Sequence, residues 1–279
     1  MGGAQRNARK KRQAHTTGGS PAVAAARRNG DRKKVVIGAV VLVVLLAAVI
    51  GGVLIYNNSK NTTEGKDIRA AAPTTSQQTG SSTAAPSPFQ VTRQDGVVVV
   101  GDDTAKVTLD VYEDFLCPAC AAFEKANGAD IQKHVEAGTV QVRYHMLPML
   151  NESSDPPGYS MDSANAGLCA ADAGMFPAYH KSLFDDQPEE GSRGWDRQQL
   201  AKLGTQLGIT SKDFTACVTS GKYDSLVQAN FADVQKATYL QQDFGNGQKG
   251  FGTPTIAVGE KVVDTAKSNW LDMLIEKAD

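Results

Sequence analysis

The chain has 279 residues, which is enough for one large domain or two small ones. Its formal net charge of -1 conceals a basic tail, because residues 1–34 carry ten Lys or Arg and one acid, Asp31, while the other 245 residues sum to -10. This tail has no interleaved aromatic residues, so it lacks the pattern of a nucleic-acid-binding arm, and we expect no nucleic-acid partner.

Residues 35–56 form an apolar stretch without one charged side chain. A helix of this length would extend about 33 Å, which is enough to cross a bilayer core of about 30 Å. The stretch exceeds the roughly 7–15 apolar residues of a cleavable signal peptide, and no A-x-A cleavage pattern follows it. The sequence therefore predicts an uncleaved transmembrane helix.

The charges on either side of this helix predict its orientation. Ten basic residues precede it, whereas only Lys60, Lys66 and Arg69 follow closely. We therefore expect a single-pass protein of the cell membrane, with a cytoplasmic N-terminus and a catalytic domain outside the cytoplasm. The basic tail is also expected to contact anionic membrane lipid.

Residues 57–88 are rich in Ser, Thr, Ala, Gln, Asn and Pro and show no hydrophobic periodicity. Such a segment cannot bury enough apolar surface to offset the entropy lost on ordering it. We therefore expect a flexible linker. Random-coil scaling predicts an average end-to-end distance of about 30 Å for this linker.

Residues 89–279 are long enough for one domain with a hydrophobic core. The run of four valines at 97–100 precedes a Gly-Asp-Asp turn, and Val107, Leu109 and Val111 then alternate with other residues. Alternation of this kind is typical of β-strands, so the domain is predicted to open with strands.

A helix is predicted to begin around Cys117 and Pro118, because proline suits the first helical position. Apolar residues then recur at helical spacing until Gly138, which is expected to end the helix. Another alternating strand follows at 140–146.

The second half of the domain has a helical pattern from about 161 to 245, interrupted by Gly and Pro. A closing hairpin is expected at 255–263, and a last helix at about 269–277. Strands at both ends and helices between them predict an α/β domain with an inserted helical subdomain.

All four cysteines lie in the part of the chain predicted to be outside the cytoplasm, where disulfides are common. Zinc sites usually combine two closely spaced cysteine pairs, and this chain has one such pair. The histidines are scattered, and there is no Gly-rich phosphate loop. We therefore expect neither a metal site nor a cofactor.

The quartet Cys117-Pro118-Ala119-Cys120 is the candidate catalytic motif. Two intervening residues on a first helical turn place both sulfurs within bonding reach, and the helix N-terminus directs unpaired N–H groups at Cys117. These groups stabilise a thiolate and lower the cysteine pKa from about 8.5 to between about 3.5 and 7.5 in such motifs. Cys117 is therefore predicted to attack and leave, and Cys120 to resolve the mixed disulfide. A structural disulfide has the same spacing.

The other two cysteines, Cys169 and Cys217, lie within the predicted helical subdomain. The preferred interpretation is a structural disulfide, which would stabilise the fold by about 4 kcal/mol in the chain-entropy model. A second redox pair that relays electrons is the alternative.

Three segments, in the same order, resemble bacterial DsbA-like proteins of the thioredoxin superfamily. They are Val98–Gly101 followed by VTLDVYEDFLCPAC at 107–120, ANAGLCAADAGMFPAYHKSLF at 164–184, and GFGTPT at 250–255. The likeness extends from about 96 to 279. It implies a thioredoxin-like fold with a helical insertion and a protein disulfide oxidoreductase activity.

The resemblance also implies that Pro254 is a cis-proline that lies against the active disulfide, with the backbone of Thr253 open to a docking substrate strand. A proline that starts an edge strand is the alternative. One position departs from the family, which often has a buried acid six residues before the first active cysteine, where this chain has Val111. Glu113, on the same face of the strand, is the candidate substitute for moving the proton of the resolving thiol.

The combined prediction is a membrane-anchored dithiol oxidase that donates the Cys117–Cys120 disulfide to exported proteins with free thiols. By resemblance, a membrane protein of the DsbB or vitamin K epoxide reductase type would reoxidise it. A reductase or isomerase of the same fold is one alternative. A tethered binding or chaperone module with purely structural cysteines is another.

Overall fold

The computed structural model describes residues 62–71, 89–243 and 249–278. The predicted basic tail, 1–34, and the predicted transmembrane helix, 35–56, lie outside these residues. Within the described ranges, no helix is long and apolar enough to cross a membrane.

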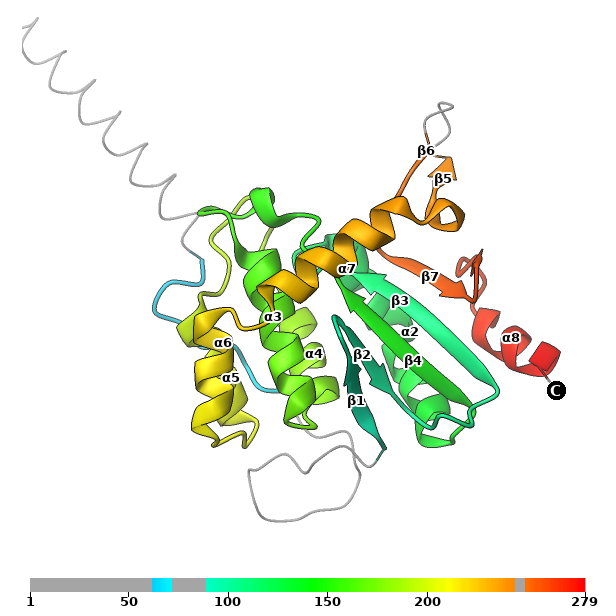
Figure 1. Ribbon diagram of the computed structural model, residues 1–279, viewed down its shortest axis with the longest axis horizontal. Helices are drawn as coiled ribbons and strands as arrows, with labels where there is room; N and C mark the ends of the chain where they lie inside the picture. Colours follow the sequence, from blue (N-terminus) through cyan, green and yellow to red (C-terminus); the bar gives the residue numbers. More distant parts are fainter. Residues whose placement is uncertain (1–61, 72–88, 244–248, 279) are drawn as a thin grey trace, which may run out of the picture. The chain divides into compact units, whose positions relative to one another are not determined.

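A six-stranded sheet forms the centre of the domain (Figure 1). Its strand order is β1-β2-β4-β3-β7-β8, in which β3 and β4 are parallel and the other neighbours are antiparallel. The strands are β1 Val91–Gln94, β2 Val97–Val100, β3 Val107–Glu113, β4 Val140–Met146, β7 Thr255–Val258 and β8 Lys261–Val262. Five consecutive residues of β3, from Leu109 to Glu113, are buried, as expected of a central strand covered on both faces.

The parallel pairing of β3 and β4 requires the chain to cross from one end of the sheet to the other, and helix α2 (Pro118–Glu136) makes this crossing. Pro118 occupies the first turn, where a backbone N–H would have no acceptor within the helix, so the absence of this N–H in proline costs no hydrogen bond. Phe123, Ile131 and Val135 bury one side of the helix, and Gly138 follows its end with a positive φ of 71°. The predicted start and stop of this helix are confirmed.

The helical insertion lies between β4 and β7 in the chain (Figure 1). Its helices are α3 Tyr159–Asp172, α4 Phe176–Asp185, α5 Arg197–Gln206, α6 Lys212–Ser220 and α7 Asp224–Lys236. Cys169 of α3 and Cys217 of α6 form the predicted disulfide, with an S–S distance of 2.01 Å. The predicted hairpin near the C-terminus is present as β7 and β8, and the last helix, α8, runs from Trp270 to Ala278.

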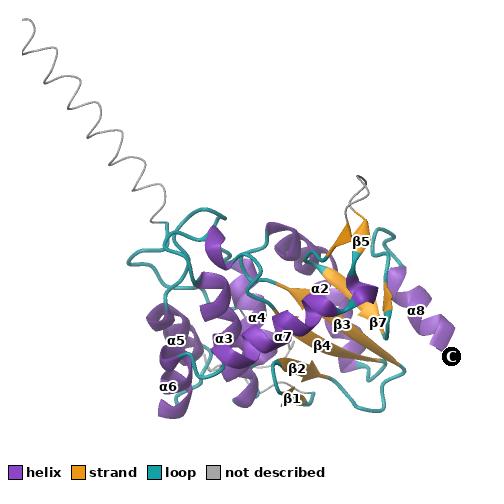
Figure 2. Cartoon of the chain, turned by 45° about the horizontal axis from the view of Figure 1, so that its top comes forward, coloured by secondary structure: helices purple, strands orange, loops and turns teal. Residues whose placement is uncertain are grey.

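The end of the insertion differs from the prediction of helix up to about 245. After α7 the chain forms a 3-10 turn, η2, and then β5 and β6, which make a small two-stranded sheet (Figure 2). A further 3-10 turn, η1, follows β4. These short elements are η1 Asn151–Ser153, η2 Thr238–Leu240, β5 Gln242–Asp243 and β6 Lys249–Gly250.

The prediction of a flexible linker at 57–88 is wrong for residues 62–71, which pack on the insertion. The Ile68 side chain is 1% exposed and belongs to the main hydrophobic core. Thr63 donates a hydrogen bond to Gly194 O at 2.9 Å, and Gln199 Nε2 donates to Thr63 O at 2.7 Å. The segment is held by one buried apolar side chain and by side chains of the insertion that hydrogen-bond to its backbone. Neither feature is visible in the average composition of the segment.

Candidate active site

The two cysteines of the CPAC motif differ in exposure because of where they lie on α2. Cys117 is the N-cap residue, directly after the loop that follows β3, and Cys120 lies inside the first turn. Cys117 is 7% exposed and Cys120 is 0% exposed, while Pro118 and Ala119 between them are exposed. Both cysteines are free thiols in this structure. Solvent and substrates therefore reach Cys117 and not Cys120.

The surroundings of Cys117 favour its thiolate. A hydrogen bond from Cys120 lowers the Cys117 pKa most, and the Thr253 side chain and the backbone N–H groups of Cys120 and Ala119 lower it further. Burial opposes these effects, and the resulting pKa is about 6. At neutral pH the reduced protein therefore holds a stabilised thiolate at Cys117.

The pKa of Cys120 is shifted in the opposite direction. Burial raises its pKa far above the ordinary value, and the hydrogen bond to Cys117 and the charge of Glu113 act in the same direction. The pair thus consists of an accessible thiolate and a buried thiol. This is the asymmetry that the roles predicted for the two cysteines require.

Strand β7 brings a second loop beside Cys117. Because Thr255 of β7 is paired with Tyr112 of β3, the residues just before β7 lie next to the end of β3. Cys117 Sγ lies 3.4 Å from the Thr253 carbonyl oxygen, and the Thr253–Pro254 peptide bond is cis. The side chain of Met149, 38% exposed, lies beside the Thr253 hydroxyl.

The side chains of Gln187 and Asp114 hold the loop before α2. Gln187 Nε2 donates to the carbonyl oxygens of Phe115, at 2.9 Å, and of Cys117, at 3.0 Å. Asp114 is fully buried and accepts hydrogen bonds from the backbone N–H of Leu116 at 2.8 Å and of Leu150 at 2.7 Å. Gln187 follows α4, about 70 residues away in sequence, so no local pattern could have revealed its role.

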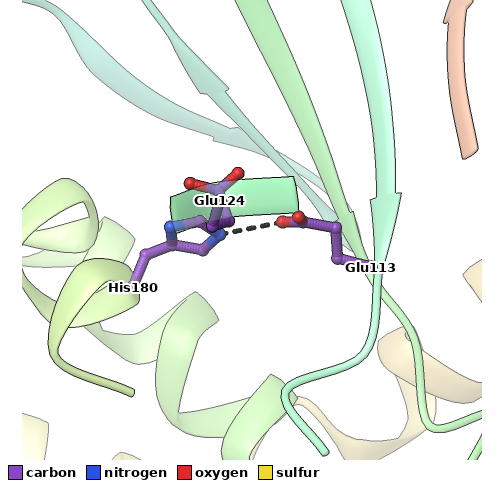
Figure 3. Close-up of side chains that lie close together, drawn as sticks. All are labelled: Glu113, Glu124 and His180. Atoms are coloured by element: carbon purple, nitrogen blue, oxygen red, sulfur yellow. Dashed lines mark hydrogen bonds and ion pairs between the residues drawn. The ribbon is translucent and has the colours of Figure 1, made fainter. Parts of the chain in front are cut away.

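Glu113, the predicted substitute for the missing buried acid, is 0% exposed at the end of β3. Val111, at the position where the family often has the acid, is an apolar core residue, also 0% exposed. Glu113 Oε2 lies 2.9 Å from Nε2 of His180 on α4, and Figure 3 shows these two side chains pointing toward one another with Glu124 of α2 beside them. Neither Glu124 nor His180 was identified from the sequence.

Burial controls the protonation of this cluster. It raises the pKa of Glu113 to about 8 and that of Glu124 to about 8, and it lowers the pKa of His180. The surroundings of His180 are apolar, because four aromatic rings pack around its imidazole, from Phe115, Tyr144, Phe176 and Phe184. At neutral pH the two acids therefore hold protons and the imidazole is neutral.

The same three side chains offer donor atoms that lie within 4.8 Å of one another, which is close enough for a single metal ion. The sequence predicts no metal site, because it has one closely spaced cysteine pair and scattered histidines. The fold brings this cluster together from three separate elements, β3, α2 and α4.

A cavity of about 530 Å³ lies between α2 and α4. Glu124 and His180 line it, together with Tyr144 and apolar side chains of both helices. Its lining also includes Lys125 and Lys181, which are exposed, so the cavity reaches the protein surface.

Comparisons with known proteins agree with this architecture. A family model described as thioredoxin matches residues 93–277. Over 185 residues the chain is 30% identical to the serine/threonine-protein kinase PknE of Mycobacterium tuberculosis, a match that covers 64% of this chain and 31% of the kinase. The chain thus spans about a third of the length of these curated relatives.

Two further matches cover most of the length of the protein that is compared with this chain. The chain is 28% identical over 170 residues to disulfide bond formation protein D of Bacillus subtilis, covering 60% of this chain and 70% of that protein. The crystal structure of reduced DsbA from Mycobacterium tuberculosis matches this chain with a TM-score of 0.55 and 28% identity, over 66% of this chain and 92% of that one.

Proposed function

Since the chain belongs to the thioredoxin family, we propose that it is a DsbA-like thiol:disulfide oxidoreductase that oxidises dithiols in exported proteins. The observation that carries the proposal is the asymmetry between Cys117, with a pKa of about 6, and the buried Cys120. A stabilised thiolate favours the reduced form of the pair, so the disulfide form is a strong oxidant.

The reaction proceeds by two exchanges. A substrate thiolate attacks Cys117 Sγ of the disulfide, a mixed disulfide forms, and Cys120 Sγ departs with the electron pair and takes up a proton. The second thiolate of the substrate then attacks the substrate sulfur of the mixed disulfide, and Cys117 departs as a thiolate. The substrate loses two electrons and the enzyme gains them. The low pKa of Cys117 makes it a good leaving group in the second exchange.

The loop at Thr253 is the proposed docking place for the substrate chain. Its carbonyl oxygen lies 3.4 Å from Cys117 Sγ, so a chain bound along this loop would bring its cysteine to the reactive sulfur. The exposed side chain of Met149 adds an apolar contact there. We further propose that Glu113 exchanges a proton with Cys120, because Glu113 is a buried acid at the end of β3, four residues before Cys117, and its ionised form would raise the pKa of the Cys120 thiol.

We also propose where the protein is located and which protein reoxidises it. Residues 35–56 would anchor the protein in the cell membrane with the domain outside the cytoplasm, where the Cys169–Cys217 disulfide would persist. Reoxidation would require a membrane partner of the DsbB or vitamin K epoxide reductase type. The similarity to proteins named DsbA and disulfide bond formation protein D supports the oxidase over a reductase or isomerase.

The test is oxidation of a reduced two-cysteine peptide by the oxidised full-length protein in detergent, followed by mass spectrometry. We expect stoichiometric formation of the peptide disulfide. Cys117→Ser and Cys120→Ser should each abolish it, because neither variant can form the Cys117–Cys120 disulfide. Full function of Cys117→Ser would instead support a binding module with structural cysteines.

A further inference from the structure

Three side chains with metal-ligand chemistry converge inside the domain. Glu113 comes from β3, Glu124 from α2 and His180 from α4, and their donor atoms lie within 4.8 Å of one another (Figure 3). Glu113 is 0% exposed and His180 is 4% exposed, and Glu113 Oε2 lies 2.9 Å from His180 Nε2. Neighbouring ligand atoms of a tetrahedral zinc site lie about 3.3 Å apart, because each is about 2.0–2.2 Å from the ion. Modest side-chain rotations would therefore place the three groups around one ion.

Two oxygen atoms of this cluster lack a hydrogen-bond donor. Glu113 Oε1 and Glu124 Oε1 are buried, and neither has a hydrogen-bond partner among the described residues. A buried carboxylate oxygen without a donor is costly, so the pair calls for a positively charged species between the two groups. A shared proton would meet this need, because the carboxyl groups are within hydrogen-bond reach of each other. A shared proton would use the two carboxyl groups alone, whereas a metal cation would use all three side chains.

Helix α2 leaves room for the Glu124 carboxylate. Gly128 lies one turn after Glu124, inside the helix, where glycine is less favourable than alanine. A Cβ atom at position 128 would lie 2.6 Å from Glu124 Oε2, too close for contact unless the carboxylate moved. The glycine thus allows Glu124 to keep the position in which its carboxylate adjoins Glu113.

A cation can reach the cluster through the cavity between α2 and α4. Glu124 and His180 line this cavity, which reaches the protein surface. The cavity lining also includes Lys181, but its Nζ lies 2.7 Å from Asp185 Oδ2, so this ion pair balances the lysine charge. Water from the cavity would complete the coordination sphere, as in zinc sites with three protein ligands.

The ligand set determines which cation fits. Ca²⁺ and Mg²⁺ prefer oxygen ligands, whereas an imidazole nitrogen combined with carboxylate oxygens suits Zn²⁺. Two ionised carboxylates also balance the charge of one divalent ion, which matters because aromatic rings surround His180.

We propose that Glu113, Glu124 and His180 form a binding site for a divalent transition-metal ion, with Zn²⁺ as the ion that the ligand set fits. The bound ion would join the central sheet, the CPAC helix and the insertion, since each supplies one ligand. Because a cation and a proton compete for the Glu113 carboxyl group, the proton exchange proposed for Glu113 belongs to the metal-free protein.

The test is Zn²⁺ binding to the full-length protein in detergent, after treatment with EDTA, removal of the chelator and oxidation of the thiols with diamide. Oxidation keeps Cys117 and Cys120 from binding zinc. Isothermal titration calorimetry should show a high-affinity site, and saturating Zn²⁺ should raise the melting temperature, because the ligands come together only in the folded protein. Co²⁺ bound in place of Zn²⁺ should show the visible absorption of a four-coordinate ion without a sulfur-to-cobalt charge-transfer band.

Glu124→Gln and His180→Gln should each weaken Zn²⁺ binding by more than the roughly 10–100-fold that loss of an outer-shell partner costs. Gly128→Ala keeps all three ligands and should also weaken binding, because its Cβ displaces the Glu124 carboxylate. His134→Gln is the matched control and should bind Zn²⁺ like the wild type. Its imidazole Nε2 lies 3.5 Å from Asp272 Oδ1, outside the cluster, where a weak adventitious site would form.

Equal Zn²⁺ affinity in the wild type, Glu124→Gln and His180→Gln would overturn the inference, because the ion would then lie elsewhere. A wild type that binds no Zn²⁺ would also overturn it and would show that the two carboxyl groups share a proton. Circular dichroism in EDTA shows whether each variant is folded, and Gly128→Ala provides the test if a ligand variant unfolds. Since the binding measurements do not depend on thiol exchange, failure of the metal site is distinguishable from failure of the proposed function.

Discussion

Cys117 Sγ lies 3.4 Å from the carbonyl oxygen of Thr253, although 136 positions separate the two residues in the chain. The antiparallel pairing of β3 with β7 produces this proximity, because both the CPAC helix and the Thr253 loop adjoin these strands. The reactive sulfur and the proposed docking loop are therefore held by the central sheet itself, and their relative position depends on its register.

The Thr253 side chain is expected to contribute to the low pKa of Cys117. Thr253→Ala removes one hydrogen bond that stabilises the thiolate, so the Cys117 pKa should rise from about 6, while Thr253→Ser should keep it near the wild-type value. Thiolate absorbance at 240 nm, measured against pH on the reduced protein, gives the pKa. A wild-type midpoint near 9, the ordinary value, would contradict the account.

Glu113→Gln should change how stability depends on pH. The folded-state pKa of Glu113 is about 8, raised from 4.5 by burial, so folding takes up a proton between these values. The stability that this protonation supports is present below pH 4.5 and is lost as the pH rises through 8. Gln cannot ionise, so the melting temperature of the variant, relative to wild type, should increase between pH 5 and pH 9. A constant difference would show that Glu113 is ionised throughout.

Removal of the Cys169–Cys217 disulfide should destabilise the protein without changing its redox chemistry. The bond closes a loop with a sequence separation of 48, so the double Cys→Ala variant should lose about 4 kcal/mol of unfolding free energy. Denaturant unfolding measures this loss. The Cys117–Cys120 reduction potential should remain at the wild-type value, and a changed rate of peptide oxidation in the folded variant would favour an electron relay.

The segment 62–71 should stabilise the domain through Ile68. Ile68→Ala leaves a cavity beneath a side chain that is 1% exposed, so the variant should lose about 2–5 kcal/mol. Glu64→Ala is the matched control, because Glu64 is an exposed residue of the same segment and should have little effect. Equal unfolding midpoints for the two variants would show that the segment is not bound in solution.

The features that the sequence predicts well are those whose signals are local. The CPAC motif, the alternating residues of β3 and β4 and the proline at the start of α2 each depend on neighbours in the chain, and the structure places them as expected. The family resemblance added the Thr253 loop, which lies beside Cys117.

The features that the sequence analysis missed depend on contacts between distant segments. His180 is 67 positions from Glu113, and no spacing rule connects them. Ile68 is a single apolar residue in a polar segment, so composition favours a flexible linker even though the insertion offers it a buried position. The strands β5 and β6 are only two residues each, too short for a periodic pattern.

The central claim is that the Cys117–Cys120 disulfide is a strong oxidant, and its equilibrium reduction potential tests this most directly. The measurement should use the full-length protein in detergent, equilibrated with glutathione redox buffers at pH 7 and analysed by thiol alkylation. The stabilised Cys117 thiolate predicts a value near about -120 mV, as for the strong oxidant of this superfamily. A value near about -270 mV, as for thioredoxin, would contradict the oxidase and indicate a reductase.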